Sequence, residues 1–384
     1  MIPRLLMDSV EELYRYFPAI YVGGPRQSGK TTLLRDTFPL LPYANLEDPD
    51  VRMFAETDPR GFLASFPAGA ILDEAQRVPS LFSYLQHVLD STPQLRFVLS
   101  GSQNFLLMEK ITQSLAGRVG ILNLLPLGFE ELPAETRAGL SALQWAWQGG
   151  FPVLYDRGAP PRLVFPNYVE TYLQRDVRLL KNVGDLGRFN RFVRLAAGRS
   201  GQLLEVSSLA RDADISVNTA KSWLSILEAS YLILFLQPYF EQYNKRLIKS
   251  PKLYFTDTGL LCYLLNITSP EELRTHYFYG NIMETMLLME YYKRYTHRGE
   301  RPRFWFWRDS NGNEIDLLIE GKGGLRAVEF KASQTFNSRH FSALAWWQKV
   351  SGMPPESCSV AYLGEQEFQT GYGALTPWHR ALLG

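Results

Sequence analysis

Cysteine is scarce in this chain. The two cysteines, Cys262 and Cys358, lie far apart, and neither belongs to a CxxC pair or to a Cys/His cluster. A disulfide framework and a structural zinc site are therefore not expected, and this usage is typical of proteins from a reducing cytosol.

Long apolar runs are also missing. The N-terminal segment MIPRLLMDSV has no apolar stretch long enough for a signal peptide. The most apolar run, residues 231–236, is far shorter than the ~20 residues that a membrane-spanning helix needs. We therefore expect a soluble, cytoplasmic protein with no membrane partner.

Neither sign of charge is in clear excess. The 40 Lys and Arg residues against 39 Asp and Glu residues leave a formal net charge of +1. This balance argues against a surface coated in positive charge for duplex DNA, although a local basic patch remains compatible with it. With 384 residues, 46% of them hydrophobic, the chain is too long for one ordinary core. We expect three domains, at residues 1–160, 161–251 and 252–384.

The first block alternates short apolar runs with amphipathic stretches. The runs AIYVGG, GAILDE and RFVLSGS are typical of buried parallel strands joined by helices, which predicts an α/β fold with a parallel sheet. The second block is mostly helical by pattern and ends in a strand at residues 231–236. The third block is again α/β, with a strand in KLYFTDTG, a helix over residues 281–295, and strands in RFWFWRD, NEIDLLIE and LRAVEFKA.

The segment GPRQSGKTT fits the phosphate-binding motif GxxxxGK[ST] at every required position. Its glycines allow backbone N–H groups to point at phosphate oxygens, Lys30 should reach the β- and γ-phosphates, and Thr31 should ligate Mg²⁺. The alternative is a chance glycine-rich turn. The residues of this segment predicted to bind ATP are Gly24, Pro25, Arg26, Gln27, Ser28, Gly29, Lys30, Thr31 and Thr32.

A second motif supports the first. The apolar run Ala70-Ile-Leu ends in Asp73 and Glu74. Asp73 would hold Mg²⁺ through water, and Glu74 would act as the general base that polarises the attacking water. The alternative is a strand that ends in a solvated acidic turn. A third run ends in Ser100 and Ser102, and in a parallel sheet its end would lie beside the γ-phosphate, where either serine could contact it.

Arg118, in the sequence Leu-Ala-Gly-Arg, is a candidate arginine finger or phosphate sensor, because a guanidinium group matches phosphate geometry. The alternative is an ordinary surface arginine. The base is expected to be adenine, since the sequence contains no [NT]KxD motif for reading guanine.

Together, GPRQSGKTT, ILDEAQRVP, LSGSQ and LAGRVGILNLLPLGFEEL resemble the AAA-type P-loop ATPases of a large bacterial and archaeal group of uncharacterised role. The later segments YVETYLQRDV, KLYFTDTGLL and EIDLLIE…AVEFK extend the resemblance over nearly the whole chain. The resemblance implies an AAA+-like core and strengthens Arg118 as a catalytic candidate. Such ATPases commonly form homo-oligomers in which a neighbour's arginine completes the site.

The middle block has the pattern of apolar and turn residues that is typical of a helix-turn-helix. We expect a first helix from a cap at Ser207 or Ser208, a turn at residues 214–216, and the strand at residues 231–236 as a wing. The second helix is predicted to bury Val217, Ala220, Leu224 and Leu227 and to expose Asn218, Lys221, Ser222 and Ser225. A single lysine is little for a DNA-reading helix, so we favour packing or protein contacts over DNA binding. The charged pair Arg175 and Asp176 is interpreted as a structural ion pair.

Four C-terminal residues form the last constellation. Glu329 and Lys331 share one strand face, and a hairpin through residues 321–324 would bring Asp316 to them. This D…ExK pattern resembles the PD-(D/E)XK nuclease superfamily, and Glu284 matches the acidic residue that this family often carries on a helix. The resemblance implies a restriction-endonuclease-like domain with a Mg²⁺ site, but we favour the alternative that the fold is kept and cutting is lost. Arg301, Arg303 and Arg308 alternate with aromatic residues, which we interpret as a strand rather than a nucleic-acid surface.

The sequence thus predicts an ATPase that uses Mg²⁺ to hydrolyse ATP to ADP and phosphate. Lys30, Glu74 and Arg118 are its predicted catalytic residues, and Thr31 and Asp73 its predicted metal ligands. The target is unknown, with DNA as one candidate through the winged-helix or the C-terminal domain. Two alternatives stay open: an ATP-gated, Mg²⁺-dependent DNA nuclease, and a nucleotide-dependent switch or scaffold with little hydrolysis.

Overall fold

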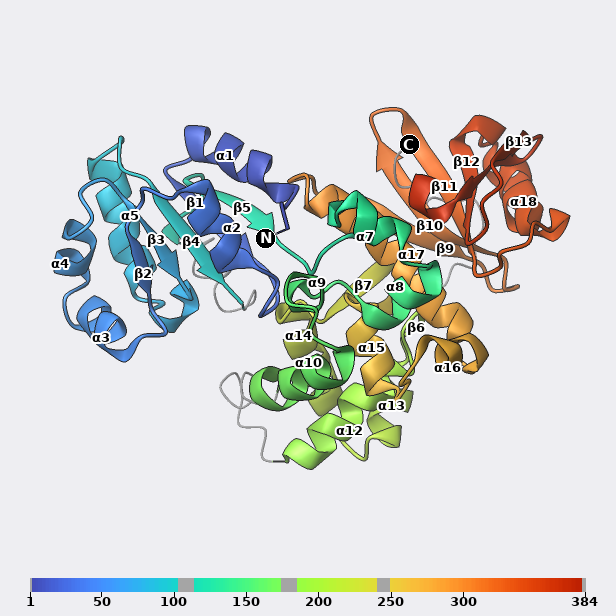
Figure 1. The fold of residues 1–384 in the computed structure, drawn as a ribbon, viewed down its shortest axis with the longest axis horizontal. Coiled ribbons are helices and arrows are strands. Elements are labelled where there is room, and N and C mark those ends of the chain that lie inside the picture. The colour runs from blue at the N-terminus through green and yellow to red at the C-terminus, as the bar shows by residue number, and fades with distance from the viewer. Residues whose placement is uncertain (1, 103–113, 174–184, 240–248, 382–384) are drawn as a thin grey trace.

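The computed structural model describes residues 2–102, 114–173, 185–239 and 249–381 (Figure 1). The pair Arg175 and Asp176 lies outside these ranges. Within them, no helix combines the length and the apolar character needed to span a membrane. Two sheets organise the described part of the chain, a five-stranded sheet near the N-terminus and a nine-stranded sheet that ends near the C-terminus.

The first sheet has the order β2-β3-β4-β1-β5, and every pair of neighbouring strands is parallel. Its strands are β1 (Ala19–Gly23), β2 (Tyr43–Asn45), β3 (Ala70–Asp73), β4 (Phe97–Gly101) and β5 (Val119–Asn123). The three apolar runs of the first block form β1, β3 and β4, and all of their residues are buried. The parallel α/β fold predicted for this block is therefore confirmed.

Helices cover both faces of this sheet. On one face, α1 (Leu6–Tyr16) and α2 (Lys30–Thr37) pack their apolar side chains on β1, β3, β4 and β5. The other face is covered by α3 (Pro49–Thr57), α4 (Pro59–Ala64) and α5 (Leu81–Ser91). Because both faces are covered, the carboxyl ends of the strands form the accessible edge of this sheet, where ligands of such folds bind.

A set of short helices follows β5 and leads into the middle of the molecule (Figure 1). It comprises η2 (Phe129–Glu131), α7 (Ala134–Ala138), α8 (Ala142–Gln148), α9 (Pro152–Asp156), α10 (Pro161–Tyr168) and the π-helix η3 (Val169–Leu173). Next come α12 (Leu186–Ala197), β6 (Gln202–Leu203), α13 (Val206–Asp212) and α14 (Val217–Ala229).

The two helices α13 and α14 depart from prediction in two details. The N-cap of α13 is Glu205, so Ser207 and Ser208 lie inside the helix instead of capping it. In α14, Ala220, Leu224 and Leu227 are buried as predicted, but Val217 is exposed. Val217 is the first residue of α14, where Ser216 caps the helix, and that end projects beyond the core that the later turns contact.

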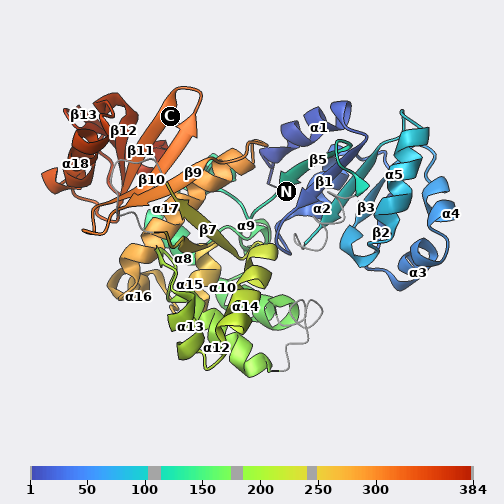
Figure 2. The same cartoon turned by 180° about the vertical axis from the view of Figure 1, so that it is seen from behind.

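The nine-stranded sheet has the order β13-β14-β12-β11-β10-β9-β7-β8-β6, so it contains strands from both the middle and the last block (Figure 2). β7 (Ile233–Pro238) pairs antiparallel with β8 (Lys252–Phe255), which pairs with β6. The other edge of β7 pairs with β9 (Phe304–Arg308) through Gln237 and Pro238. The strand that follows α14 is thereby joined to the C-terminal strands.

The remaining strands are β10 (Glu314–Gly321), β11 (Gly324–Lys331), β12 (Cys358–Tyr362), β13 (Phe368–Thr370) and β14 (Gly373–Pro377). β10 and β11 form the predicted hairpin, with Gly321 opposite Gly324. The predicted aromatic strand is confirmed as β9, in which Phe304, Phe306 and Trp307 are buried. The helices of this part are α15 (Thr258–Leu264), α16 (Pro270–Thr275), α17 (Tyr279–Thr296), η4 (Ser338–Phe341), α18 (Ser342–Ser351), η5 (Pro355–Ser357) and α19 (Trp378–Ala381).

Candidate functional site

The glycine-rich segment between β1 and α2 lies at the carboxyl edge of the parallel sheet. Gly24 has φ 154°, and a Cβ there would lie 2.1 Å from the carbonyl oxygen of Leu124. Gly29 has φ 95° and is the N-cap of α2, so the loop bends tightly just before the helix starts. Both positions need glycine, since a side chain would clash at Gly24 and would be strained at Gly29. The loop therefore directs the N-terminus of α2 at the space above the sheet.

Lys30, the first residue of α2, is buried and folds back over this loop. Its ammonium group donates hydrogen bonds to the carbonyl oxygens of Gly24, at 3.0 Å, and Pro25, at 2.8 Å. Both of these oxygens are uncharged. A phosphate group that enters the loop is therefore a more strongly attractive acceptor for the ammonium than either of them.

Asp73, at the end of β3, is buried and accepts hydrogen bonds from three hydroxyl groups. Thr31 Oγ1 donates to Oδ2 at 2.6 Å, the Tyr43 hydroxyl donates to the same oxygen at 2.7 Å, and Ser100 Oγ donates to Oδ1. The contact with Asp73 raises the pKa of Tyr43, for which burial is the larger cause. The structure thus brings the two predicted Mg²⁺ ligands, Thr31 and Asp73, into direct contact.

Glu74 follows Asp73 with left-handed backbone angles, φ 54° and ψ 41°, which turn its side chain away from the strand direction. Its carboxylate accepts hydrogen bonds from Gln76 Nε2 and, at 3.4 Å, from the hydroxyl of Ser102. Gln76 also donates to Ser102 at 3.2 Å. A left-handed non-glycine residue at this place is a local strain of the kind found at functional sites.

A cavity of about 410 Å³ opens above these residues. From the glycine-rich loop and β3, it is lined by Arg26, Gln27, Gly29, Lys30, Thr31, Thr32 and Glu74. Its opposite wall comes from α9 and the residue after it, Pro152, Val153, Asp156 and Arg157. This wall was not predicted, because no sequence motif marks residues 152–157.

A second cavity, of about 300 Å³, adjoins the first one and shares Gly29, Thr32, Pro152 and Asp156 with it. Most of its remaining lining is apolar and comes from the N-terminal segment, α2 and the chain after β5. These residues are Ile2, Pro3, Met7, Leu33 and Leu127, together with Arg4 and Asp36. The sequence analysis missed this cavity too, because no local motif marks residues 2–7.

Arg4 connects the glycine-rich loop with the C-terminal part of the chain through Glu131 and His297. Its guanidinium donates to the carbonyl oxygens of Ser28, at 2.6 Å, and Leu125, at 2.8 Å, and pairs with Glu131 at 3.0 Å. On the other side, His297 at the C-terminus of α17 donates through Nδ1 to Glu131 at 2.9 Å. All three side chains, Arg4, Glu131 and His297, are buried.

The charge states in this buried cluster follow from its contacts. Burial opposes ionisation of Glu131, but His297 and Arg4 outweigh it and hold the pKa of this carboxyl group well below its usual range. Burial lowers the pKa of His297, although Glu131 favours the protonated ring. His297 Nε2 accepts a hydrogen bond from the Leu125 N–H at 3.2 Å, as a neutral ring with its proton on Nδ1 can.

Arg118 is not brought to this site. It immediately precedes β5, and its carbonyl oxygen accepts a hydrogen bond from Ala19 at the start of β1. It therefore lies at the amino edge of the parallel sheet, opposite the glycine-rich loop. Its guanidinium pairs with Asp90, with Nη2 to Oδ2 at 3.0 Å. A role for Arg118 at the nucleotide of a neighbouring subunit stays a prediction.

The four predicted residues of the C-terminal cluster lie near one another on α17, β10 and β11. Asp316 accepts a hydrogen bond from the Phe330 N–H at 2.8 Å, and Lys331 Nζ pairs with Glu329 at 2.8 Å. Burial raises the pKa of Asp316 well above its usual range, and Glu329 and Glu284 add to this effect by repulsion. Burial also raises the pKa of Glu329.

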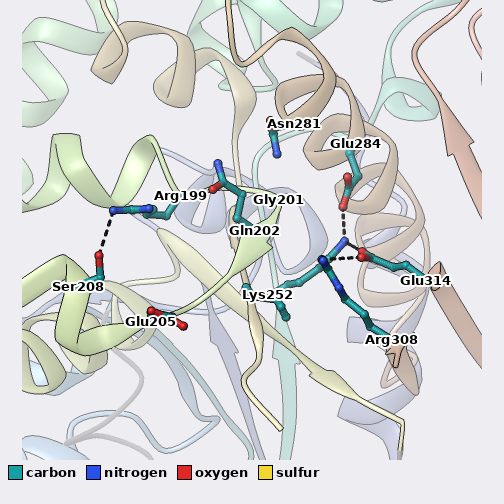
Figure 3. A pocket seen from close by; sticks show the side chains of 11 residues that line it. Arg199, Gly201, Gln202, Glu205, Ser208, Lys252, Asn281, Glu284, Arg308 and Glu314 are labelled. Carbon is teal, nitrogen blue, oxygen red and sulfur yellow. Dashed lines mark hydrogen bonds and ion pairs between the residues drawn. The ribbon is translucent and has the colours of Figure 1, made fainter. Parts of the chain in front are cut away.

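Glu284 contacts Lys252 of β8 (Figure 3) and also Tyr254 of the same strand, neither of which was a predicted site residue. Lys252 Nζ lies 2.9 Å from Glu284 Oε1, and the Tyr254 hydroxyl donates to the same oxygen at 2.7 Å. Among the described residues, no group of three or more His, Cys, Asp or Glu side chains has an arrangement that could hold a metal ion. In this structure Glu284 is paired with Lys252, and Glu329 is paired with Lys331.

Comparisons with known families divide the chain into three matches. Residues 16–133 match a family described as AAA domain. Residues 141–271 and residues 279–380 match two domains of unknown function, DUF8612 and DUF4143. The AAA match contains the glycine-rich loop, Asp73, Glu74 and Ser100, whereas the DUF4143 match contains Glu284, Asp316, Glu329 and Lys331.

Relatives cover most of the chain. Uncharacterized proteins of Mycobacterium tuberculosis and Mycobacterium bovis are each 30% identical to it over 323 residues, which make up 83% of this chain and 71% of each relative. Among solved structures, a Walker-type ATPase of Pyrococcus abyssi aligns with a TM-score of 0.46 at 17% identity, over 67% of this chain and 94% of that one. A signal-transduction ATPase with numerous domains from Pyrococcus horikoshii aligns with a TM-score of 0.28 at 13% identity, over 76% of this chain and 46% of that one.

Proposed function

Since the chain belongs to one family with its mycobacterial relatives and carries an AAA-type ATPase domain, we propose that it binds ATP with Mg²⁺ at the glycine-rich loop and hydrolyses it to ADP and phosphate. The observation that carries the proposal is the direct contact between Thr31 and Asp73 beside the Lys30 ammonium, at the carboxyl edge of the sheet. A hydroxyl and a carboxylate in this arrangement, next to a lysine on a helix N-terminus, match the needs of a triphosphate and its metal.

The loop residues would hold the phosphates. Backbone N–H groups between Arg26 and Thr32 would face phosphate oxygens, and Lys30 would move from the carbonyl oxygens of the loop to the β- and γ-phosphates. Mg²⁺ would be held by the Thr31 hydroxyl and, through water, by Asp73, and when bound it neutralises charge on the phosphates. Ser100 donates to Asp73, so we assign it the role of orienting this carboxylate.

Glu74 would act as the general base. Its carboxylate lines the cavity, and Gln76 and Ser102 hold it at the end of β3. From there it can accept a proton from a water molecule that attacks the γ-phosphate, while the left-handed backbone at Glu74 fixes the direction of its side chain. Ser102 acts here by positioning Glu74 and not by contacting phosphate.

The apolar cavity beside the loop would hold the adenine base. It shares four lining residues with the phosphate cavity, so a base and a triphosphate can occupy the two at once. Ile2, Pro3 and Met7 would cover one side of the ring, and Leu127 and Pro152 the other. Arg157, in the opposite wall of the phosphate cavity, would add a positive charge from the segment that follows the sheet.

The test separates binding from hydrolysis. Glu74→Gln is expected to keep ATP affinity within about threefold and to lower turnover at least ~100-fold, because only the general base is lost. Lys30→Ala is expected to lose both. Glu12→Gln, an exposed carboxylate on α1, is the matched control and should behave like wild type. Negligible phosphate release by the wild type, even with DNA present, would contradict the proposal and favour a nucleotide switch.

The middle block would serve as a packing unit. The order α12–β6–α13–α14–β7–β8, with β8 paired between β6 and β7, supports a winged-helix-like unit, and one edge of β7 is occupied by β9. The exposed part of α14 offers Lys221 as its single cation, beside Asn218 and Ser225. We therefore propose that this unit contacts protein and not DNA. Duplex DNA binding that falls with salt and is lost in Lys221→Ala would contradict this.

A further inference from the structure

The C-terminal cluster departs from its motif through a residue that the motif does not contain. Lys252 comes from β8, next to the middle block, whereas Glu284 and Glu314 come from α17 and β10 (Figure 3). The side chain of Lys252 is 3% exposed, so its ammonium lies inside the protein and points at both carboxylates. The ammonium group of Lys252 is therefore a buried component of the folded protein.

Lys252 and two further side chains contact the carboxylates of Glu284 and Glu314. Its Nζ lies 2.9 Å from Glu284 Oε1 and also pairs with Glu314 Oε1. Arg308 Nη1 pairs with the other oxygen of Glu314 at 2.9 Å, and the Tyr254 hydroxyl donates to Glu284 at 2.7 Å. Glu284 and Glu314 are therefore each held by Lys252 and by a second donor, beside Asp316, which accepts from the Phe330 N–H.

Charge leads to the same conclusion. Three carboxylates of the cluster, those of Glu284, Glu314 and Glu329, pair with three cations, those of Lys252, Arg308 and Lys331. A divalent ion bound to Glu284 Oε1 or Glu314 Oε1 would have to displace the buried ammonium, which would leave that charge without its partners in a site of low dielectric. A cavity of about 490 Å³ beside Lys252 is lined by cations and carboxylates alike.

We propose that Lys252 is a built-in cation that takes the place of the divalent metal, so that the nuclease-like cluster acts as an ion-pair joint between β8 and the C-terminal domain and does not cut nucleic acid. The joint connects the strand next to the middle block with α17 and β10. His297, at the C-terminus of α17, contacts Glu131, and Glu131 pairs with Arg4. The helix that carries Glu284 is thereby connected to the glycine-rich loop, to which Arg4 donates a hydrogen bond.

The experiment uses Mn²⁺ as the probe, on the full chain without nucleotide. Mn²⁺ binding is measured by calorimetry for wild type, Glu284→Gln, Lys252→Met and the double variant Lys252→Met/Glu284→Gln. Lys349→Met, at an exposed position on α18, controls for the loss of a lysine charge, and Lys252→Arg retains the cation. Dependence on Glu284 distinguishes this site from ion binding at Asp73.

We expect Glu284→Gln to leave the Mn²⁺ binding of the wild type unchanged. Lys252→Met should gain a site at least tenfold tighter, which the added Glu284→Gln removes, and Mn²⁺ should raise the melting temperature of Lys252→Met only. Wild-type binding that Glu284→Gln abolishes would overturn the proposal, as would Lys252→Met folding without gaining a site. If Lys252→Met does not fold even with Mn²⁺, the comparison of wild type with Glu284→Gln decides alone. Mn²⁺-dependent DNA cleavage lost in Lys331→Ala would also overturn the proposal.

Discussion

Two buried sites in this molecule place a lysine beside acidic residues, and their partners differ. At the nucleotide loop, Lys30 donates to backbone carbonyl oxygens, and Asp73 accepts from the hydroxyl groups of Thr31, Tyr43 and Ser100. At the C-terminal cluster, Lys252 is paired with two carboxylates, those of Glu284 and Glu314. The hydrogen bonds named here for Lys30 and Asp73 join them to uncharged groups, whereas Lys252 is paired with ions.

This difference determines what each site can bind. A neutral hydroxyl or carbonyl group can exchange a lysine or a carboxylate for a phosphate or a metal ion at modest cost. A buried ion pair cannot, because the released charge loses both its solvent and its partner. On the functions proposed above, the glycine-rich loop would therefore accept a ligand, whereas Lys252 would stand in for a metal ion at the C-terminal cluster. Two sequence motifs that both predict a Mg²⁺ site thus lead to different chemistry.

The largest expected effect is on stability. Lys252→Met should lower the free energy of unfolding by about 3–5 kcal/mol, because it leaves buried carboxylates without their cation. Lys30→Met should cost less, about 1–3 kcal/mol, because the two hydrogen bonds to carbonyl oxygens contribute about 0.5–1.5 kcal/mol each. Urea unfolding followed by tryptophan fluorescence measures both variants. Equal losses would show that the partners of the two lysines do not differ in the way described.

The next effect tests whether the cavity beside the loop accepts a ligand. Met7→Trp should fill the apolar cavity and weaken ATP binding about tenfold, or ~1.4 kcal/mol, with little change in melting temperature. Glu12→Trp places the same side chain at an exposed position of α1 and should bind ATP like the wild type. Calorimetric titration with ATP measures both. An ATP affinity unchanged in Met7→Trp would show that the adenine base does not bind in this cavity.

A smaller effect concerns the ionic cluster of Arg4, Glu131 and His297. The pKa of His297 is lowered by folding, so the unfolded chain takes up a proton first as the pH falls below its usual value of 6.5. The stability that neutral His297 provides is complete above that pH and declines towards pH 5. The lowered pKa of Glu131 acts with the same sign below pH 4.5. His297→Gln should make the melting temperature fall less steeply between pH 7 and pH 5. If the melting temperature falls as steeply as in the wild type, groups other than His297 cause the decline.

The smallest expected effect is at Arg118. The residue lies at the edge of the sheet opposite the loop and pairs with Asp90, so Arg118→Ala should leave ATP affinity within about twofold of the wild type. Calorimetry at low protein concentration measures this affinity. Turnover measured over a range of protein concentrations tests the role in a neighbouring subunit, because a trans arginine would lower turnover only when the chain assembles. A clear loss of affinity at low concentration would contradict the position described here.

Much of the fold and of the candidate nucleotide site could be predicted from the sequence. The AAA-type domain is confirmed by the family match, and the parallel strands and the β10–β11 hairpin are confirmed by their pairing. These predictions succeeded because the apolar runs are buried on both faces and because phosphate binding needs a contiguous loop. The start of α13 and the exposure of Val217 were predicted wrongly, since caps and helix ends depend on what the neighbouring helices cover.

The sequence by itself determined the elements whose chemistry is local: the glycine-bent loop from Gly24 to Thr32, the acidic strand end at Asp73 and Glu74, and the apolar runs that make both sheets. The tertiary structure alone decided which distant side chains meet. It placed Met7 and Arg157 at the nucleotide cavities, Arg4 below the loop, and Lys252 between Glu284 and Glu314. The reason is physical: a motif specifies the residues that carry charge, but only packing specifies which opposite charge or hydroxyl each of them is buried against.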